Sequence, residues 1–206
     1  MNRHAPAPRD EAAATAAWDA VVIGGSSGAI DVLNLLLPAL PAGLCAAVIV
    51  LVHLPRDRRS LLADIFRDRC ALPLREAEDQ MPIQPGHLYF APPDYHLLVD
   101  RGPRLALSIG PPVHFSRPSI DVLFQSAADG YGARLLGILL SGANEDGAKG
   151  LAAIQAAGGM AVVQAPETAA MRAMPEAALA RVAFAHVLPP AAIAALLARL
   201  PAQRVP

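Results

Sequence analysis

The chain has 206 residues, a formal net charge of −1 and a hydrophobic content of 54%. Its length fits the ~100–200 residues of one domain. The balanced charge argues against a nucleic-acid backbone or an anionic membrane surface as the target, because both reward clustered basic residues. The apolar content excludes disorder over most of the chain.

The sequence carries no sign of export or of membrane insertion. The two cysteines, Cys45 and Cys70, are too few for a disulfide framework and are typical of small core residues in a reducing compartment. The longest apolar run, Leu44–Leu54, has about half the ~20 residues of a membrane span. The charged, Ala-rich start, Met1–Ala17, lacks a signal-peptide core. We therefore expect a cytoplasmic protein.

The chain is expected to form a tail over residues 1–18 and a single domain over 19–206, in which strands and helices alternate from Ala20 onward. The predicted strands are Ala20–Gly24, Ala46–Val52, Leu72–Ala77, His87–Ala91, His96–Asp100, Leu105–Ile109, Leu135–Leu140, Met160–Gln164 and Ala183–Leu188. The predicted helices are Ala29–Leu37, Ser60–Arg69, Ile120–Gly130, Gly147–Ala157, one opened by Pro175, and Pro190–Leu200.

The middle of the chain departs from this alternation. Four short strands between residues 72 and 109 are joined by Pro and Gly turns that leave no room for helices. This pattern indicates an antiparallel excursion. The predicted fold class is α/β, a doubly wound, mostly parallel, Rossmann-like sheet with a small antiparallel β insertion.

Polar side chains with complementary chemistry follow three of the predicted strands. Ser26 lies in the glycine-rich turn after the first strand, His53 follows the second, and Asp146 comes after Leu135–Leu140. In such sheets ligands bind outside the carboxyl ends of the strands. A serine hydroxyl becomes nucleophilic when an imidazole takes its proton, and a carboxylate must orient that imidazole. Together they indicate a serine hydrolase.

Each of these residues also has a structural interpretation when taken alone. Ser26 or Ser27 could cap the predicted helix Ala29–Leu37, and Asp146 could cap the predicted helix Gly147–Ala157. His53 could be a satisfied histidine that closes a buried strand. His96 and His114 lack the spacing of a metal site, so we interpret them as structural and expect no metal.

Two other enzyme classes share the glycine-rich turn but fail elsewhere. The turn resembles the entry loop of short-chain dehydrogenases, yet the only lysine, Lys149, has Glu145 where their tyrosine should stand. Ordinary α/β-hydrolases run serine, acid, histidine, whereas the order here is Ser26, His53, Asp146.

A set of motifs resembles the catalytic domain of the CheB-type chemotaxis receptor methylesterases, the protein-glutamate methylesterases, from Val21 to Leu200. The motifs are Ile23–Gly28, His53-Leu54-Pro55, Ala91–His96, Arg117–Phe124, Ser141-Gly142 with Asp146-Gly147-Ala148, and Met174-Pro175. They occur in the family's order.

The resemblance implies an esterase that removes methyl groups from glutamate side chains on the cytoplasmic part of a chemoreceptor and releases methanol, with glutamine deamidation as a further activity. It implies Ser26 as nucleophile, His53 as base and Asp146 as the orienting carboxylate. The backbone N–H of Ala143 falls where the family places an oxyanion donor. No cofactor is implied.

The chain departs from the family's usual serine turn, Gly-Ala-Ser-Thr-Gly-Gly. It has Gly25 before the nucleophile, Ser27 for the threonine and Ala29 for the last glycine, and Ala143 stands where methionine is common. These departures keep open an alternative, a catalytically weak docking module. With about 18 residues before the first strand, we expect no receiver domain, so a separate response regulator is a candidate partner.

Overall fold

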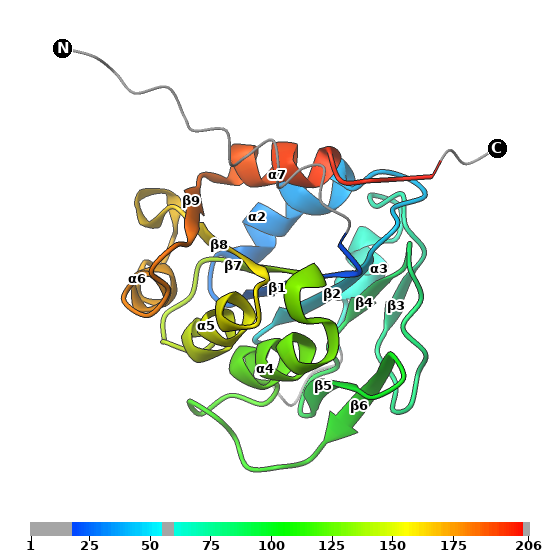
Figure 1. Ribbon diagram of the computed structural model, residues 1–206, viewed down its shortest axis with the longest axis horizontal. Helices are drawn as coiled ribbons and strands as arrows, with labels where there is room; N and C mark the ends of the chain where they lie inside the picture. Colours follow the sequence, from blue (N-terminus) through cyan, green and yellow to red (C-terminus); the bar gives the residue numbers. More distant parts are fainter. Residues whose placement is uncertain (1–17, 55–59, 204–206) are drawn as a thin grey trace.

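The computed structural model describes residues 18–54 and 60–203, and its centre is a seven-stranded sheet with the order β3-β4-β2-β1-β7-β8-β9 (Figure 1). The strands are β1 (Ala20–Gly25), β2 (Ala47–Val52), β3 (Leu74–Glu76), β4 (Leu88–Phe90), β5 (His96–Asp100), β6 (Arg104–Ser108), β7 (Leu135–Leu139), β8 (Met160–Gln164) and β9 (His186–Leu188). The helices are α2 (Ala29–Leu36), α3 (Leu62–Phe66), α4 (Ile120–Tyr131), α5 (Ala148–Ala156), α6 (Ala173–Leu179) and α7 (Pro190–Ala198), with short 3-10 turns at Leu37–Ala39, Gly132–Arg134 and Pro166–Thr168.

The central strands are buried along their whole length, as their continuous apolar sequences predict. Strand β1 pairs in parallel with both β2 and β7, with Ala20 opposite Ala47 and Gly25 opposite Val52. Side chains of alternate residues in β1 therefore enter the two separate cores on either side of the sheet.

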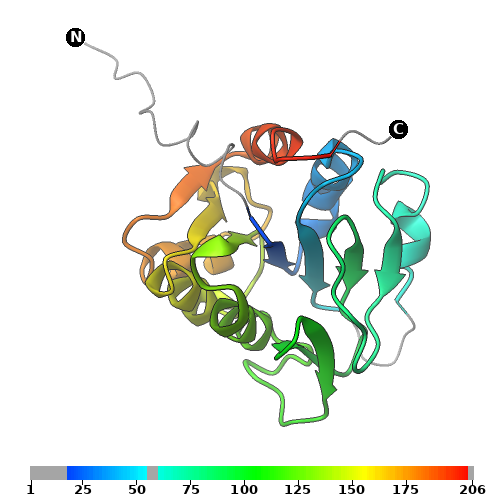
Figure 2. The same cartoon turned by 45° about the vertical axis from the view of Figure 1, so that its right-hand side comes forward.

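Helices cover both faces of the sheet. Helices α2 and α7 pack together on one face, whereas α4, α5 and α6 cover the other (Figures 1 and 2). The β5–β6 hairpin lies beside α4, outside the main sheet, and packs against that helix. The predicted doubly wound sheet is confirmed.

The predicted antiparallel excursion is only half right. Strands β5 and β6 form an antiparallel pair, but β3 and β4 pair in parallel and extend the main sheet next to β2. Residues 77–87 connect β3 to the parallel strand β4 without forming a helix. Parallel strands are usually connected through a helix, so this turn-rich segment gave no sign of a parallel crossover. The helix predicted over Ser60–Arg69 is also shorter and spans Leu62–Phe66.

The topology determines where a site can form. Strand β1 lies between β2 and β7. The chain continues from β1 to β2, β3 and β4 on one side and then to β7, β8 and β9 on the other, so the strand order reverses there. In open α/β sheets the crevice beyond the carboxyl ends at this reversal is where ligands bind. The residues after β1, β2 and β7 are therefore neighbours at one edge.

Two expectations fall partly outside the described residues. Residues 1–17, most of the predicted tail, and Pro55 of the His53-Leu54-Pro55 motif are not among them. Within 18–54 and 60–203, no helix has both the length and the apolar character needed to cross a bilayer.

The close approach of α5 to α4 at Gly150 predicts a stability effect. A Cβ added at Gly150 of α5 would lie 2.5 Å from Cβ of Phe124 and 3.1 Å from Cα of Asp121, both on α4. Alanine favours a helix over glycine by about 1 kcal/mol, but this overlap cannot be relieved by a side-chain rotation. We expect Gly150→Ala to lower the free energy of unfolding by about 1–2 kcal/mol in urea titrations.

The neighbouring Lys149→Ala is the control, because Lys149 lies on the same helix with an exposed side chain. It should change the free energy of unfolding by less than about 0.5 kcal/mol. A Gly150→Ala protein as stable as the unaltered chain would contradict the close helix packing.

Candidate active site

The first component of the site is the turn between β1 and α2. Gly28 is the N-cap of α2 with φ 83°, a left-handed conformation that favours glycine, and no side chain caps this helix. The interpretation of Ser26 or Ser27 as the helix cap is therefore wrong. Ser26 is half-buried and Ser27 exposed, so the turn holds both without using either hydroxyl as a cap.

Backbone hydrogen bonds align the three strand ends. The N–H of His53 donates to the carbonyl of Gly25 at 3.1 Å, and the N–H of Ser26 donates to the carbonyl of Ser141 at 2.9 Å. These bonds continue the β2–β1 and β1–β7 pairings just beyond the strand ends. Ser26, His53 and the segment after β7 consequently lie next to one another, as the sequence predicts.

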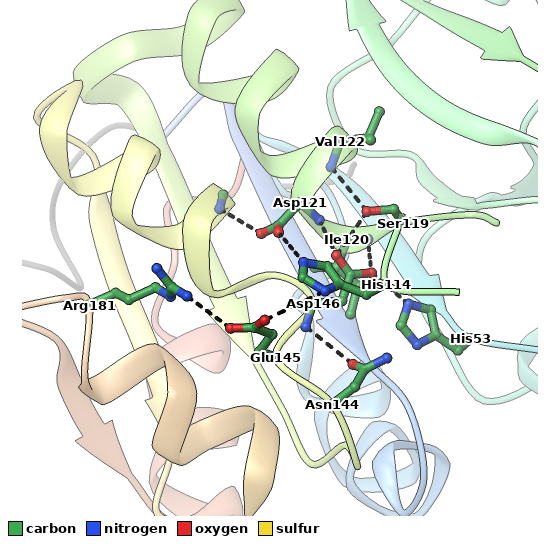
Figure 3. Close-up of polar contacts among 11 residues, drawn as sticks. His53, His114, Ser119, Ile120, Asp121, Val122, Asn144, Glu145, Asp146 and Arg181 are labelled. Atoms are coloured by element: carbon green, nitrogen blue, oxygen red, sulfur yellow. Dashed lines mark hydrogen bonds and ion pairs between the residues drawn. The ribbon is translucent and has the colours of Figure 1, made fainter. Parts of the chain in front are cut away.

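The carboxylate of Asp146 is the most heavily hydrogen-bonded group of the site (Figure 3). Its Oδ2 accepts from His53 Nε2 at 2.8 Å and from the Ile120 N–H at 2.7 Å. Its Oδ1 accepts from Ser119 Oγ at 2.8 Å and from the Asp121 N–H at 3.0 Å. The side chain is fully buried, and these four donors satisfy both oxygens.

Two of those donors are backbone amides at the start of α4. Asp146 therefore occupies the N-terminus of α4, where the helix dipole favours negative charge. It does not cap α5, whose N-cap is Gly147 without a side-chain bond, so that interpretation is wrong. Burial raises the pKa of Asp146, but the hydrogen bonds from His53 and the two amides outweigh burial and hold the pKa below its usual value.

A second buried carboxylate, Asp121, lies behind Asp146. It accepts from the Gly150 N–H at 2.8 Å, and His114 Nε2 approaches it at 3.5 Å. Burial raises the pKa of Asp121, and the charge of Asp146 adds to that effect. On its other side His114 approaches Glu145, which pairs with Arg181 (Figure 3).

One group of the described residues has the composition of a metal site. His114, Asp121 and Asp146 each place one ligand atom within 4.8 Å of the others. Both oxygens of Asp146 already accept two hydrogen bonds each, so a cation there would have to displace the donors that hold His53 and α4. The geometry favours a charge network over a metal centre.

Two departures in the serine turn compensate each other. A Cβ added at Gly25 would lie 2.5 Å from Cβ of Ala29, which is the first residue of α2 and needs no left-handed backbone. The family's usual turn has the reverse arrangement, with alanine before the serine and glycine at the last position. In both arrangements one methyl group fills the space between the two positions. In this chain it belongs to Ala29 and not to residue 25.

The hydroxyl of buried Ser141 joins the loops around the turn. It donates to the carbonyl of Ser27 at 2.7 Å and accepts from the Met171 N–H at 2.9 Å. The N–H of Ser141 donates to the buried side chain of Gln164 at 2.9 Å. One serine therefore connects the loops that follow β1, β7 and β8.

Ala143, the predicted oxyanion donor, is an exposed residue of the largely buried segment between β7 and α5. Among the described residues, the structure gives its N–H no acceptor. The preceding residue, Gly142, bonds Met171 through its N–H and Met174 through its carbonyl, which holds the segment in place. The structure thus leaves the N–H of Ala143 available at the same edge of the sheet as Ser26.

Comparison with known proteins agrees with this geometry. The sequence matches the model of the CheB methylesterase family over residues 21–197. The chain belongs to that family. The crystal structure of the Thermotoga maritima CheB methylesterase catalytic domain superposes with a TM-score of 0.81 at 28% identity, covering 89% of this chain and 98% of that one.

Relatives at higher identity cover the chain less completely. A Leptospira interrogans protein is 40% identical over 141 residues, 68% of this chain and 73% of that protein. The protein-glutamate methylesterase/protein-glutamine glutaminase of Symbiobacterium thermophilum is 42% identical over 138 residues, 67% of this chain but only 38% of that protein. The comparisons support a carboxylic ester hydrolase over a docking module without turnover.

Sequence reasoning missed the residues that support Asp146. Ser119 lies in the motif Arg117–Phe124 but has no catalytic role in that pattern, and His114 was interpreted as structural. Ser119 contacts a residue 27 positions away, and His114 contacts Asp121 from the irregular segment before α4, so no spacing rule predicts either contact. The predicted partnership of His53 and Asp146 does appear as a hydrogen bond.

The exchanged methyl group predicts a coupled pair. We expect Gly25→Ala alone to destabilise the protein, because its Cβ meets Ala29 at 2.5 Å and Cβ of Leu140 at 3.2 Å. Adding Ala29→Gly should recover part of the loss, with a coupling of roughly 0.5–3 kcal/mol in urea unfolding. Strict additivity of the two changes would show that the residues do not share one space.

The two buried aspartates predict opposite pH effects. A carboxyl whose pKa is lowered on folding adds stability above its unfolded pKa of ~3.9, and that stability is lost as the pH falls. Asp146→Asn should therefore lower the free energy of unfolding most at pH 7 and progressively less toward pH 3. Denaturant unfolding at several pH values measures this.

Asp121→Asn is the matched control. Because the pKa of Asp121 is raised, its ionisation destabilises the folded state as the pH rises. The change that Asp121→Asn makes to the free energy of unfolding should therefore be more stabilising, or less destabilising, at pH 7 than at pH 3. The same pH trend in both variants would contradict these environments.

Proposed function

We propose that the protein hydrolyses methyl esters of glutamate side chains on chemoreceptors, with Ser26, His53 and Asp146 as its catalytic residues. The observation that carries this proposal is the bond from His53 Nε2 to the buried Asp146, at the strand end next to Ser26. Membership of the CheB methylesterase family supports the substrate class.

The bond to Asp146 assigns the two ring nitrogens of His53 different tasks. An ionised carboxylate only accepts, so Nε2 carries the proton in that bond and Nδ1 is left to take the proton of Ser26. Asp146, with its lowered pKa, stays ionised at neutral pH and stabilises the imidazolium that forms.

In the proposed reaction, Ser26 Oγ attacks the ester carbonyl while its proton moves to His53. The carbonyl oxygen becomes an oxyanion, and the proposed donor to it is the N–H of Ala143. Collapse of the intermediate breaks the bond to methoxide, which takes the proton from His53 and leaves as methanol. Water activated by His53 then hydrolyses the acyl-enzyme and returns Ser26 and a glutamate.

The same steps apply to a glutamine side chain, with ammonia as the leaving group. The Symbiobacterium thermophilum relative carries both activities in its name, protein-glutamate methylesterase/protein-glutamine glutaminase. We propose deamidation as a second reaction of this site.

Chemoreceptor substrates would place the enzyme in the cytoplasm, and a separate response regulator remains the proposed means of control. The proposed unit of activity is the single domain of residues 19–206.

The test is methanol release from radiolabelled, methylated receptor membranes. We expect release by the unaltered protein and a fall of at least ~10³-fold in Ser26→Ala, because the nucleophile is lost. Ser27→Ala is the matched control: its hydroxyl is adjacent but exposed, and it should retain the activity.

Each outcome distinguishes a part of the proposal. Equal loss in both serine variants would point to a disturbed turn, which circular dichroism and thermal unfolding would detect. Release by Ser26→Ala at the unaltered rate would overturn the assignment of the nucleophile. No release by any form, together with hydrolysis of a small activated ester, would show that the esterase acts on another substrate.

A further inference from the structure

The β5–β6 hairpin contributes a buried histidine that the proposed reaction does not use. His96, the first residue of β5, is 3% exposed and sits against the N-terminus of α4. Its Nε2 lies 2.9 Å from the carbonyl of Pro111, and its Nδ1 lies 3.2 Å from the N–H of Ser119.

These two partners fix the protonation state of the ring. A carbonyl can only accept, so Nε2 carries a proton; the Ser119 amide can only donate, so Nδ1 carries none. His96 is therefore neutral, in one tautomer, with both nitrogens satisfied. Protonation would set Nδ1–H against the amide of Ser119.

Ser119 connects this histidine to the active site. Its N–H bonds His96, while its hydroxyl donates to Oδ1 of Asp146 at 2.8 Å and accepts from the Val122 N–H as the N-cap of α4. The next two amides of α4 also bond Asp146. The position of Ser119 thus determines where the start of α4 holds the carboxylate.

We propose that His96 is a positioning residue of the active site, which acts through Ser119 to hold Asp146, and hence His53, in the geometry that catalysis requires. The chain of contacts runs from His96 Nδ1 to the Ser119 N–H, from Ser119 Oγ to Asp146 Oδ1, and from Asp146 Oδ2 to His53 Nε2. The β5–β6 hairpin thereby contributes to a site that is otherwise built from the ends of β1, β2 and β7 and the start of α4.

The charged groups near this contact chain belong to other interactions. Arg117 donates from Nη2 to Asp94 at 2.8 Å and from Nη1 to the carbonyl of Ile109, and Asp121 bonds Gly150. No charged side chain bonds His96 among the described residues, so its effect on Asp146 passes through the Ser119 amide.

The proposal rests on the proposed function for its kinetic test, and two substitutions separate the two ring contacts. In His96→Asn the amide oxygen takes the place of Nδ1 and can still accept from Ser119. In His96→Gln the longer side chain can reach Pro111 with its NH₂ but leaves the Ser119 N–H without its acceptor.

We expect His96→Gln to lower kcat roughly tenfold with KM within about twofold, because a buried donor loses its partner. His96→Asn should keep kcat within about threefold. The control is His87→Gln. His87 directly precedes β4, at the sheet edge opposite the site, and its ring contacts the carbonyl of Pro85; the substitution should not change kcat. Equal losses in the Asn and Gln variants, or a loss confined to KM, would overturn the proposal.

A spectroscopic measurement keeps this test separate from the proposed function. The proton that His53 Nε2 donates to Asp146 should give a downfield resonance in the proton NMR spectrum of the free protein. We expect the resonance in His96→Asn and its shift or loss in His96→Gln. An unchanged resonance in His96→Gln would overturn the proposal even if no receptor ester is hydrolysed by the unaltered protein.

If thermal unfolding shows that His96→Gln does not fold, Ser119→Ala takes its place. This variant keeps the amide that bonds His96 and removes only the hydroxyl that bonds Asp146. We expect roughly a tenfold lower kcat with unchanged KM. An unaltered kcat in Ser119→Ala would remove Ser119 from the contact chain and overturn the proposal.

Discussion

The arrangement of the site depends on placing one carboxylate, Asp146, at the start of helix α4 without contact with water. A buried charge is costly unless its oxygens are all hydrogen-bonded, and here two backbone amides, Ser119 Oγ and His53 supply the four bonds. Because the helix amides cannot move independently, they hold the carboxylate in one orientation. The hydrogen bond from His53 to Asp146 then fixes the orientation of the imidazole ring. Correct folding of α4 is therefore a condition for a correctly oriented base.

Strand ends could be predicted well from the sequence because the central strands are continuous apolar runs bounded by glycine or polar turns. Ala20–Gly24 and Met160–Gln164 differ from β1 and β8 by at most one residue. From those ends, the general rule for open α/β sheets brought Ser26, His53 and Asp146 to one edge. The hydrogen bond of His53 with Asp146 and the strand pairing beside Ser26 agree with that deduction.

The remainder could not be predicted because it depends on contacts between loops that lie far apart in sequence. The parallel pairing of β3 with β4 has no local signature, since short strands joined by turns favour an antiparallel reading. The bond from Ser119 to Asp146 is likewise invisible to periodicity. The compensation between Gly25 and Ala29 is also invisible in the sequence, because only the folded turn brings Cβ of Ala29 into the space that Gly25 leaves empty.

The hydroxyl of Ser141 has a consequence for how sequences of this kind can vary. Because it bonds the turn after β1 and the segment before α6, an insertion in either loop would have to preserve the same meeting point. Between β6 and α4, Pro111 and Ser119 contact His96 and Asp146, whereas the side chains of Ile109 and Phe115 are 75% and 99% exposed. Diversity among homologues should therefore accumulate at such exposed positions, while the loops joined by Ser141 keep their lengths.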